Sequence, residues 1–371
     1  MVATGDILIL GLNPAWQKTL VFGGLHFGEV NRAESVVWQA SGKGINAARA
    51  LHGRGVAATV LQFAGGDTGR RLRRALDAEG IAHASVLTAG ETRVCTTLLS
   101  PPPAAMTELI EPSGPVTADE RRRLRGRLER LLPHCRGVAI CGTCPPGVPD
   151  RLYAEVIAAA RGHALVLLDG YRQVVEALAA GPHVLKINRR ELEELTEKLP
   201  FAGAGGFSGE EVRAHGPRAR QASPGGQATG LSKRGLSREG DVAAAARALL
   251  ARYPVGCVAV TDGPDKAFLV TRDRAWRYAM PRLDRVVSPL GAGDCASGVM
   301  LAECLAALPR DESPDAWLRE SAGRGRMPAL ATAFARALAA ASASCTTPVP
   351  GDSPWRLARR LAAHLAVSPL P

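Results

Sequence analysis

Short apolar runs alternate with amphipathic stretches along most of this chain. Buried strands are predicted at short, mostly apolar runs, at residues 7–12, 57–63, 138–141, 164–168, 184–187 and 257–260. Helices are predicted where apolar residues recur at helical spacing, at residues 45–51, 68–79, 151–161, 173–180, 190–198 and 241–253. Strands that alternate with helices in this way predict a three-layer α/β/α fold, with a mainly parallel central sheet between two layers of helices.

Two other segments, residues 19–38 and 93–110, have the pattern of strands without intervening helices. They predict a small antiparallel sheet set apart from the main layer. A lid over a binding site is the natural use of such a sheet. We therefore expect a β-sheet lid formed by residues of about 12–40 and 93–112.

Residues 201–240 interrupt the alternation with a stretch rich in glycine, serine and arginine. This composition predicts a disordered insertion over about 201–238, and a phosphorylatable or basic interaction loop is the alternative. A smaller insertion is expected at about 309–328. Apart from these two segments, residues 1–371 are expected to form a single domain.

The composition, with 46% hydrophobic and 22% charged residues over 371 positions, is that of a globular protein. No stretch approaches the roughly 18 consecutive apolar residues of a membrane-spanning helix, so no membrane partner is expected. The first six residues carry no basic region of a secretory signal. These observations predict a cytoplasmic protein.

The formal net charge of +11 invites a nucleic-acid interpretation. Most of the 46 basic residues are arginine, however, and they are scattered along the chain. The aromatic residues do not alternate with basic runs, as a stacking surface for nucleic acid requires. We therefore expect no nucleic-acid partner.

The eight cysteines mostly lie among small apolar neighbours, as buried free thiols of a reducing compartment do. Cys141 and Cys144 form a CxxC pair, for which a redox dithiol is an alternative to a strand end that turns into a proline-rich loop. No second cysteine or histidine pair stands at zinc spacing, so no structural zinc is expected.

The sequence GAGD at residues 291–294 leads directly into a helix-like segment. Small residues at a helix start leave backbone N–H groups open to an anion. Asp294 beside such groups can accept a proton from a hydroxyl that attacks a phosphoryl group. The simpler interpretation is that Asp294 caps the helix after a glycine turn.

The pattern GxGxx[GA] occurs twice, at residues 42–47 and 291–296. The first copy follows a predicted strand and opens a helix, so a nicotinamide dinucleotide site is an alternative interpretation. A Walker-type phosphate loop is excluded because no GxxxxGK[ST] sequence exists.

Four motifs that follow one another along the chain give a more specific indication. They are SGKGINAA at 41–48, GGDTG at 65–69, KINRRE at 186–191 and GAGD at 291–294. In type, order and spacing they resemble the signatures of the ribokinase-like (PfkB) carbohydrate kinases. The resemblance covers almost the entire chain apart from the two insertions, and it implies a ribokinase-like domain with a small β-sheet lid.

Within that family the chain is most similar to the phosphosugar branch of 1-phosphofructokinase and tagatose-6-phosphate kinase. LNPA at 12–15, GEVN at 28–31 and Lys43 match that branch. Arg93 stands where those kinases have an arginine that contacts the sugar phosphate.

The resemblance implies roles on the nucleotide side. Asp294 would be the general base, and the N–H groups of Gly291, Ala292 and Gly293 would stabilise the charge on the transferred γ-phosphoryl. The residues expected to bind ATP are Lys186, Asn188, Thr261 and Gly263. Glu191 and Asn188 would hold Mg²⁺ through water.

The resemblance also implies that Gly42, Lys43, Asn46 and Arg93 bind the phosphosugar, with Lys43 and Arg93 supplying charge to its phosphate. Gln17 stands where the family has an aspartate that accepts hydrogen bonds from sugar hydroxyls. A glutamine there offers a carbonyl oxygen and an NH₂ group but no charge.

Three further positions depart from the family pattern. Cys141 replaces a hydroxyl-bearing residue of the family's SGSLP loop, Ser288 precedes Pro289 where a threonine is usual before GAGD, and Lys266 stands where a small residue is expected. None removes the base or the glycine turn, so the acceptor sugar is the property they affect.

Together these residues predict an ATP- and Mg²⁺-dependent kinase that converts fructose 1-phosphate to fructose 1,6-bisphosphate, or tagatose 6-phosphate to its bisphosphate. The alternatives are a kinase for another sugar or a nucleoside, a catalytically weak sugar-phosphate sensor, and a nicotinamide-dependent oxidoreductase. Pairing of two lids would cover exposed strand edges, so a homodimer through the lid is expected.

Overall fold

The computed structural model describes residues 6–100, 105–170, 172–198, 236, 239–321 and 329–370. The insertion predicted at about 201–238 lies outside the described residues except for Leu236. Of the smaller insertion predicted at about 309–328, residues 322–328 lie outside them as well.

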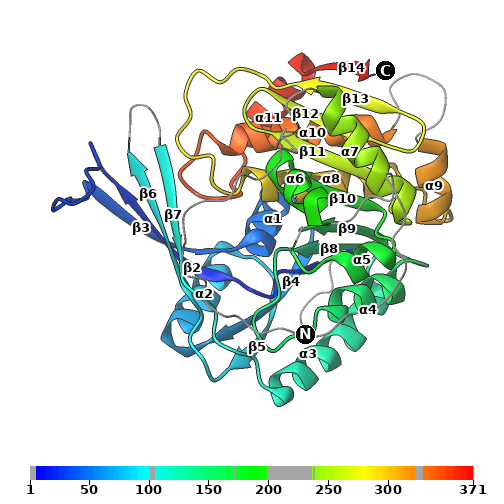
Figure 1. Ribbon diagram of the computed structural model, residues 1–371. Coiled ribbons are helices and arrows are strands. Elements are labelled where there is room, and N and C mark those ends of the chain that lie inside the picture. Colours follow the sequence, from blue (N-terminus) through cyan, green and yellow to red (C-terminus); the bar gives the residue numbers. More distant parts are fainter. Residues whose placement is uncertain are drawn as a thin grey trace, which may run out of the picture.

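A ten-stranded sheet forms the centre of the described molecule, in the order β14-β13-β12-β11-β10-β9-β8-β1-β4-β5 (Figure 1). Its parallel part comprises β1 (Ile7–Leu10), β4 (Ala58–Gly65), β5 (His83–Thr88), β8 (Gly137–Cys141), β9 (Leu165–Asp169), β10 (Val184–Asn188) and β11 (Cys257–Asp262). The antiparallel extension comprises β12 (Lys266–Val270), β13 (Ala275–Ala279) and β14 (Ala366–Leu370). The α/β fold with a mainly parallel sheet is therefore confirmed.

Two apolar cores lie on opposite faces of this sheet, because successive side chains of a strand point to opposite sides. In β1, Ile7 and Ile9 join the first core, and Leu8 and Leu10 join the second. Such strands are buried on both faces, which is why they appear in the sequence as continuous apolar runs.

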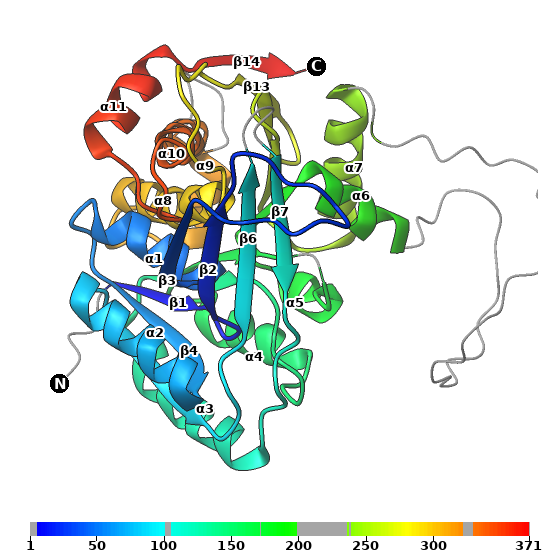
Figure 2. The same cartoon turned by 90° about the vertical axis from the view of Figure 1, so that its left-hand side faces the viewer.

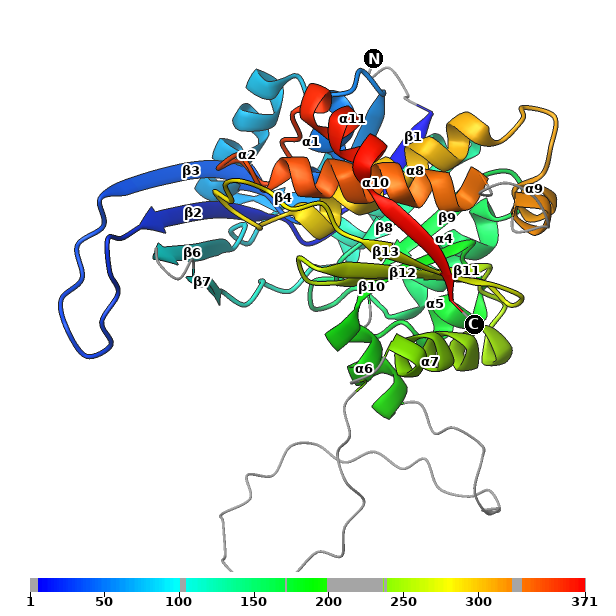
Figure 3. The same ribbon diagram turned by 90° about the horizontal axis from the view of Figure 1, so that it is seen from above.

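The helices divide between these two cores. The first core is covered by α1 (Lys43–His52), α2 (Gly66–Glu79), α8 (Ala292–Ala307), α9 (Pro314–Ser321), α10 (Ala329–Ser344) and α11 (Trp355–His364). The second is covered by α3 (Ala118–Leu131), which a short 3₁₀ turn η1 (Leu132–His134) follows, and by α4 (Arg151–Ala160), α5 (Val175–Ala179), α6 (Arg189–Lys198) and α7 (Glu239–Arg252). Seen from above, α8, α10 and α11 lie on one side of the strands, and α6 and α7 lie on the other (Figure 3).

Helix α9 falls within the segment predicted as the smaller insertion. Its side chains Trp317 and Leu318 are buried in the first core. This part of the segment is therefore packed structure, and the sequence pattern did not indicate it because the helix is short and polar at half of its positions.

A second, smaller sheet stands beside the main one, with its strands β3-β2-β6-β7 side by side (Figure 2). It comprises β2 (Ala15–Val21), β3 (Ser35–Ser41), β6 (Val94–Ser100) and β7 (Ala105–Ile110). The expectation of an antiparallel sheet is wrong for its central pair, because β2 and β6 run parallel. Their connection passes through β3, α1, β4, α2 and β5, so β6 starts at the same end as β2. We refer to these four strands as the small sheet.

Candidate active site

The candidate site lies where three parallel strands of the main sheet end. β9 ends at Asp169, β10 at Asn188 and β11 at Asp262. Side-chain bonds described below bring the first turns of α1 and α8 to the same edge. Ligands of open α/β sheets bind at the carboxyl ends of their strands, so this edge is the expected location of a binding site.

Asp169 is the centre of a buried ionic network that the sequence analysis did not identify. Its side chain is fully buried, and Oδ1 lies 2.8 Å from Lys43 Nζ while Oδ2 lies 3.4 Å from Lys186 Nζ. Ser297 Oγ on α8 donates to Oδ2 at 2.5 Å. Burial alone would raise the pKa of Asp169, but the two ammonium groups outweigh it and lower the pKa to about 2. Asp169 therefore stays ionised and fixes both lysines.

The pKa of Lys43 is raised above its ordinary value. Burial alone would lower it, but the carboxylates of Asp169, Glu191 and Asp294 stabilise the ammonium form more strongly. Glu191 Oε1 lies 3.5 Å from Lys43 Nζ. Lys43 is thus a permanent cation at neutral pH, held between α1, β9 and α6.

Asp294 lies in the first turn of α8 and is bonded to Asn46 of α1. Asn46 Nδ2 donates to Asp294 Oδ2 at 2.8 Å. Burial raises the pKa of Asp294 above its ordinary value, Lys43 opposes this shift and Asp169 adds to it. A carboxylate with a raised pKa is a stronger base than an exposed one, which suits proton abstraction.

Arg49 supports this arrangement from behind, and the sequence analysis missed it too. The buried guanidinium donates to Pro350 O at 2.6 Å, to Ala40 O at 2.7 Å and, at 3.4 Å, to Asn46 Oδ1. The sequence spacing could have indicated it, because Arg49 follows Asn46 by three positions and so lies on the same face of α1. It ties the end of β3 and the loop after α10 to the residue that holds Asp294.

The start of α8 has the backbone that a glycine turn predicts. Gly291 has φ of 77°, and a Cβ there would lie 2.8 Å from Pro350 Cβ. At Gly293 an added Cβ would lie 2.9 Å from Lys186 Nζ, so this ammonium group sits directly beside the turn. One of the predicted anion-binding amides is already engaged, because Ala292 N donates to Pro289 O at 3.2 Å.

Asn188 and Glu191 form a reciprocal cap at the start of α6. Glu191 N donates to Asn188 Oδ1, and Asn188 N donates to Glu191 Oε2, both at 2.9 Å. One carboxylate oxygen of Glu191 thus has a structural role, and the other faces Lys43. Within the described residues no cluster of three or more His, Cys, Asp or Glu side chains is arranged to hold a metal ion.

A cavity of about 290 Å³ lies in front of Lys43. Its lining includes Gly42, Arg93, Cys141 and Glu191. Arg93 is held by backbone carbonyls, since Nη2 donates to Asn13 O at 3.0 Å and Nε to Pro14 O at 3.4 Å. Lys43 of α1 and Arg93, which directly precedes β6, are both predicted to bind a sugar phosphate, and they meet at this cavity.

Gln17 lies on β2 of the small sheet and is buried. Its Nε2 donates to Thr97 Oγ1 on β6 at 2.8 Å and, at 3.4 Å, to Lys18 O. The amide is therefore held in place by the neighbouring strand.

Thr261 and Gly263 lie at the next strand end. Thr261 is paired in register with Asn188, and Gly263 has φ of 64° with open space around it. Lys266, the departure from the family pattern, forms an ion pair with Glu239 Oε1 at 3.3 Å. Its charge is directed to α7.

The two thiols of the CxxC pair are both free. Burial raises the pKa of Cys141 well above its ordinary value and that of Cys144 to about 11. A redox dithiol needs a thiol that ionises near neutral pH, so these shifts disfavour that alternative. Cys141 instead contributes an apolar wall to the cavity.

Fixed cations, a carboxylate and a glycine turn meet at one edge of this α/β sheet, an arrangement that suits the class of phosphotransferases that act on small molecules. The family profile of the pfkB family carbohydrate kinases matches residues 9–219, more than half of the chain. The chain belongs to this family. It is accordingly a carbohydrate kinase, which transfers a phosphoryl group to an alcohol group of a sugar.

Solved structures of three kinases share the fold. Phosphofructokinase-2 from Escherichia coli, in complex with substrates and products, is 22% identical with a TM-score of 0.74, over 96% of this chain and 98% of that one. A protein named as a possible 1-phosphofructokinase from Thermotoga maritima is 20% identical with a TM-score of 0.71, over 98% and 99%. Ribokinase from Giardia lamblia is 17% identical with a TM-score of 0.72, over 96% and 99%. None of the described helices is long and apolar enough to cross a membrane.

Proposed function

We propose that this kinase transfers the γ-phosphoryl group of ATP to a hydroxyl of a phosphosugar, with fructose 1-phosphate as the acceptor and fructose 1,6-bisphosphate as the product. Tagatose 6-phosphate is the second acceptor of the same chemistry. The observation that carries the proposal is that Lys43 and Asn46 lie on one turn of α1. A sugar whose phosphate is bound by Lys43 and Arg93 would then have a hydroxyl near Asp294, the partner of Asn46.

In the proposed reaction Asp294 accepts the proton of the attacking hydroxyl. The sugar oxygen forms a bond to the γ-phosphorus, and the bond between that phosphorus and the bridging oxygen of ADP breaks. The amides of Gly291 and Gly293, with Lys186 beside them, would stabilise the charge of the transferred group. The Ala292 amide would contribute less because it is bonded to Pro289.

The nucleotide would lie over the ends of β10 and β11, near Lys186, Asn188, Thr261 and Gly263. Asn188 and Glu191 have the oxygen donors of a hydrated Mg²⁺ site, and the described residues form no protein cage. When bound, Mg²⁺ would neutralise part of the triphosphate charge.

The small sheet, with its flanking residues of about 12–40 and 93–112, would act as a lid that excludes water and limits ATP hydrolysis. Several large apolar side chains of the small sheet and its β2–β3 connection are exposed, among them Phe27, Val30 and Trp38. A second copy of the chain would cover them, so we propose a homodimer through this surface. Residues 1–371 would form one kinase domain, in the cytoplasm.

The test is ATP consumption with Mg²⁺ against fructose 1-phosphate, fructose 6-phosphate, tagatose 6-phosphate, free hexoses and nucleosides, with Asp294→Asn as the matched variant. Turnover on one phosphosugar that is lost in the variant supports the proposal. Turnover on a free hexose or a nucleoside alone would instead establish a kinase for another acceptor. Ligand-induced thermal stabilisation without turnover would favour a sugar-phosphate sensor.

A further inference from the structure

The side chain of Gln39 on β3 is buried, with 7% of its surface exposed, and is not satisfied by the protein. Neither Nε2 nor Oε1 has a hydrogen-bond partner among the described residues. A buried amide without a partner destabilises the folded state, and native proteins keep few of them. Such a group is explained when a ligand supplies the missing partners.

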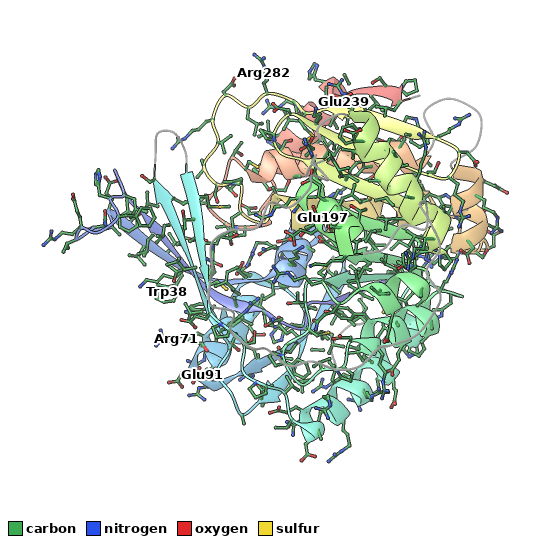
Figure 4. All side chains as sticks on the ribbon, in the orientation of Figure 1. Trp38, Arg71, Glu91, Glu197, Glu239 and Arg282 are labelled. Carbon is green, nitrogen blue, oxygen red and sulfur yellow. The ribbon has the colours of Figure 1, made fainter. Side chains whose placement is uncertain are left out.

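The alternation of side chains along β3 shows where Gln39 points. Ser41, two residues further on, lies on the same face of the strand, and its Oγ donates to Asn46 Oδ1 at 3.2 Å. The opposite face carries Ala40 and Trp38. Trp38 stacks on Trp16 and lies on the outer side of the small sheet in Figure 4. Gln39 therefore faces the cleft that contains Asn46 and Asp294.

Two other polar side chains share that face. Gln17 is directly opposite Gln39 in the register of β2 and β3, and its amide is held by Thr97. Glu108 is directly opposite Thr97 in the register of β6 and β7. Burial raises the pKa of Glu108, and the charge of Asp294 raises it further, so this face is electrostatically coupled to the candidate base.

We propose that Gln39 is a specificity-determining residue that binds a hydroxyl group of the acceptor sugar, next to Gln17. This inference rests on the proposed function, because it assigns the part of the acceptor that carries no phosphate. An amide both donates and accepts hydrogen bonds, as a sugar hydroxyl does, whereas a carboxylate only accepts. The phosphate is left to Lys43 and Arg93, which supply charge that Gln39 lacks.

The Gln39 amide is shielded in the conformation described. A sugar reaches it when the small sheet, the proposed lid, tilts away from the main sheet. Binding then replaces an unsatisfied amide by a bonded one, so closure over the correct sugar is favoured by the groups that recognise it.

The variant Gln39→Leu tests this assignment, because it keeps most of the side-chain volume and removes the amide. We expect the KM for the acceptor sugar to rise at least about 10-fold, a loss of about 1.4 kcal/mol, with the KM for ATP unchanged. The melting temperature should stay equal or rise, since an unsatisfied buried amide has been removed. An unchanged acceptor KM overturns the proposal. If the melting temperature falls as well, Gln39 has a packing role instead.

Thr59→Val is the matched control. Thr59 is also buried with an unpartnered hydroxyl, but it lies on β4 in the main sheet. Removing this hydroxyl should leave the KM for the acceptor sugar and the KM for ATP unchanged.

Binding is measured separately by the thermal shift that fructose 1-phosphate, fructose 6-phosphate, tagatose 6-phosphate and fructose produce. Stabilisation of the wild-type protein by one of these sugars, with phosphorylation of none of them, contradicts the proposed function. If Gln39→Leu loses that stabilisation, the inference about Gln39 nevertheless stands. Phosphorylation by both proteins with the same acceptor KM contradicts the inference and leaves the proposed function standing.

Discussion

Asn46 and Asp294 are 248 positions apart in the chain, and they form a direct hydrogen bond of 2.8 Å between Nδ2 and Oδ2. The bond joins the first turns of α1 and α8. Asn46 is held in turn through its Oδ1 by Ser41 and Arg49. These two donors fix the orientation of the Asn46 amide. Its NH₂ group therefore points to Asp294 and orients that carboxylate.

This relationship predicts the effect of Asn46→Asp. The new carboxylate still accepts bonds from Ser41 and Arg49, so the fold should be kept. It places a second negative charge beside Asp294 in place of a donor, which raises the pKa of Asp294 further. We expect kcat to fall by about 100-fold, with the acid limb of the pH profile moved to higher pH. Steady-state kinetics from pH 5 to 9, beside a circular dichroism melt, measure both effects; an unmoved acid limb would contradict the role of Asp294 as base.

A second prediction concerns pH and Lys43. A general base works only when it is deprotonated, so activity is present above the pKa of Asp294 and is lost as pH falls through it. Lys43 lowers that pKa. Lys43→Met should therefore move the acid limb of kcat to higher pH, besides raising the KM for a phosphorylated acceptor.

Lys18→Met is the control for this pH effect. Lys18 lies over the ring of Trp38, 5.2 Å from its centroid, on the outer face of the small sheet. The variant Lys18→Met removes the same formal charge from the chain, but it should leave the acid limb of the kcat profile unchanged. A shift of equal size in both variants would attribute the effect to net charge rather than to Lys43.

The alternation of strand and helix was predictable for β4, β8, β9 and β10, because each is a compact apolar run with an amphipathic stretch after it. β5, α3, α10 and α11 were not predicted. The antiparallel strands β12, β13 and β14 were not predicted, since β12 is an apolar run that no helix follows, and β13 and β14 mix apolar and polar residues. The parallel pairing of β2 with β6 was also not predictable, because local patterns contain no information about which end of a sheet a distant strand enters.

The candidate site was predictable only where residues stand in motifs. Lys43, Asn46 and Asp294 belong to glycine-rich segments with recognisable spacing, and their side chains meet in the structure. Asp169 ends an apolar strand with no motif around it, so its role appears only when the fold brings two lysines to it. The sequence did not indicate Gln39, because the feature that singles it out is a buried amide without hydrogen-bond partners, which only the folded structure shows.

Asp169→Asn should destabilise the folded protein. The amide has nearly the same shape but no charge, so two ammonium groups lose their shared carboxylate in a buried setting. Lys43 is one-third exposed, so solvent screens part of its interaction with Asp169. We expect the free energy of unfolding at pH 7 to fall by about 2 kcal/mol, as measured by urea denaturation.

The same variant has a pH dependence with a definite sign. The pKa of Asp169 is lowered from 3.8 to about 2 in the folded state. Its contribution to stability is therefore complete above about pH 4 and is lost as pH falls toward 2. The difference between wild type and Asp169→Asn should shrink over that window; a constant difference would show that Asp169 acts through packing alone.

The close approach of α1 and α8 gives the last prediction. A Cβ added to Gly298 would lie 2.7 Å from Ala47 O, so Gly298→Ala must push the two helices apart. The bond between Asn46 and Asp294 spans these same helices. We expect a loss of about 1–3 kcal/mol in the free energy of unfolding together with a fall in kcat. Gly126→Ala is the matched control, because Gly126 lies in α3 with open space around it and should be stabilised by up to about 1 kcal/mol with activity unchanged. If Gly298→Ala lowered stability but kept full kcat, the orientation of Asp294 would not depend on the spacing of α1 and α8.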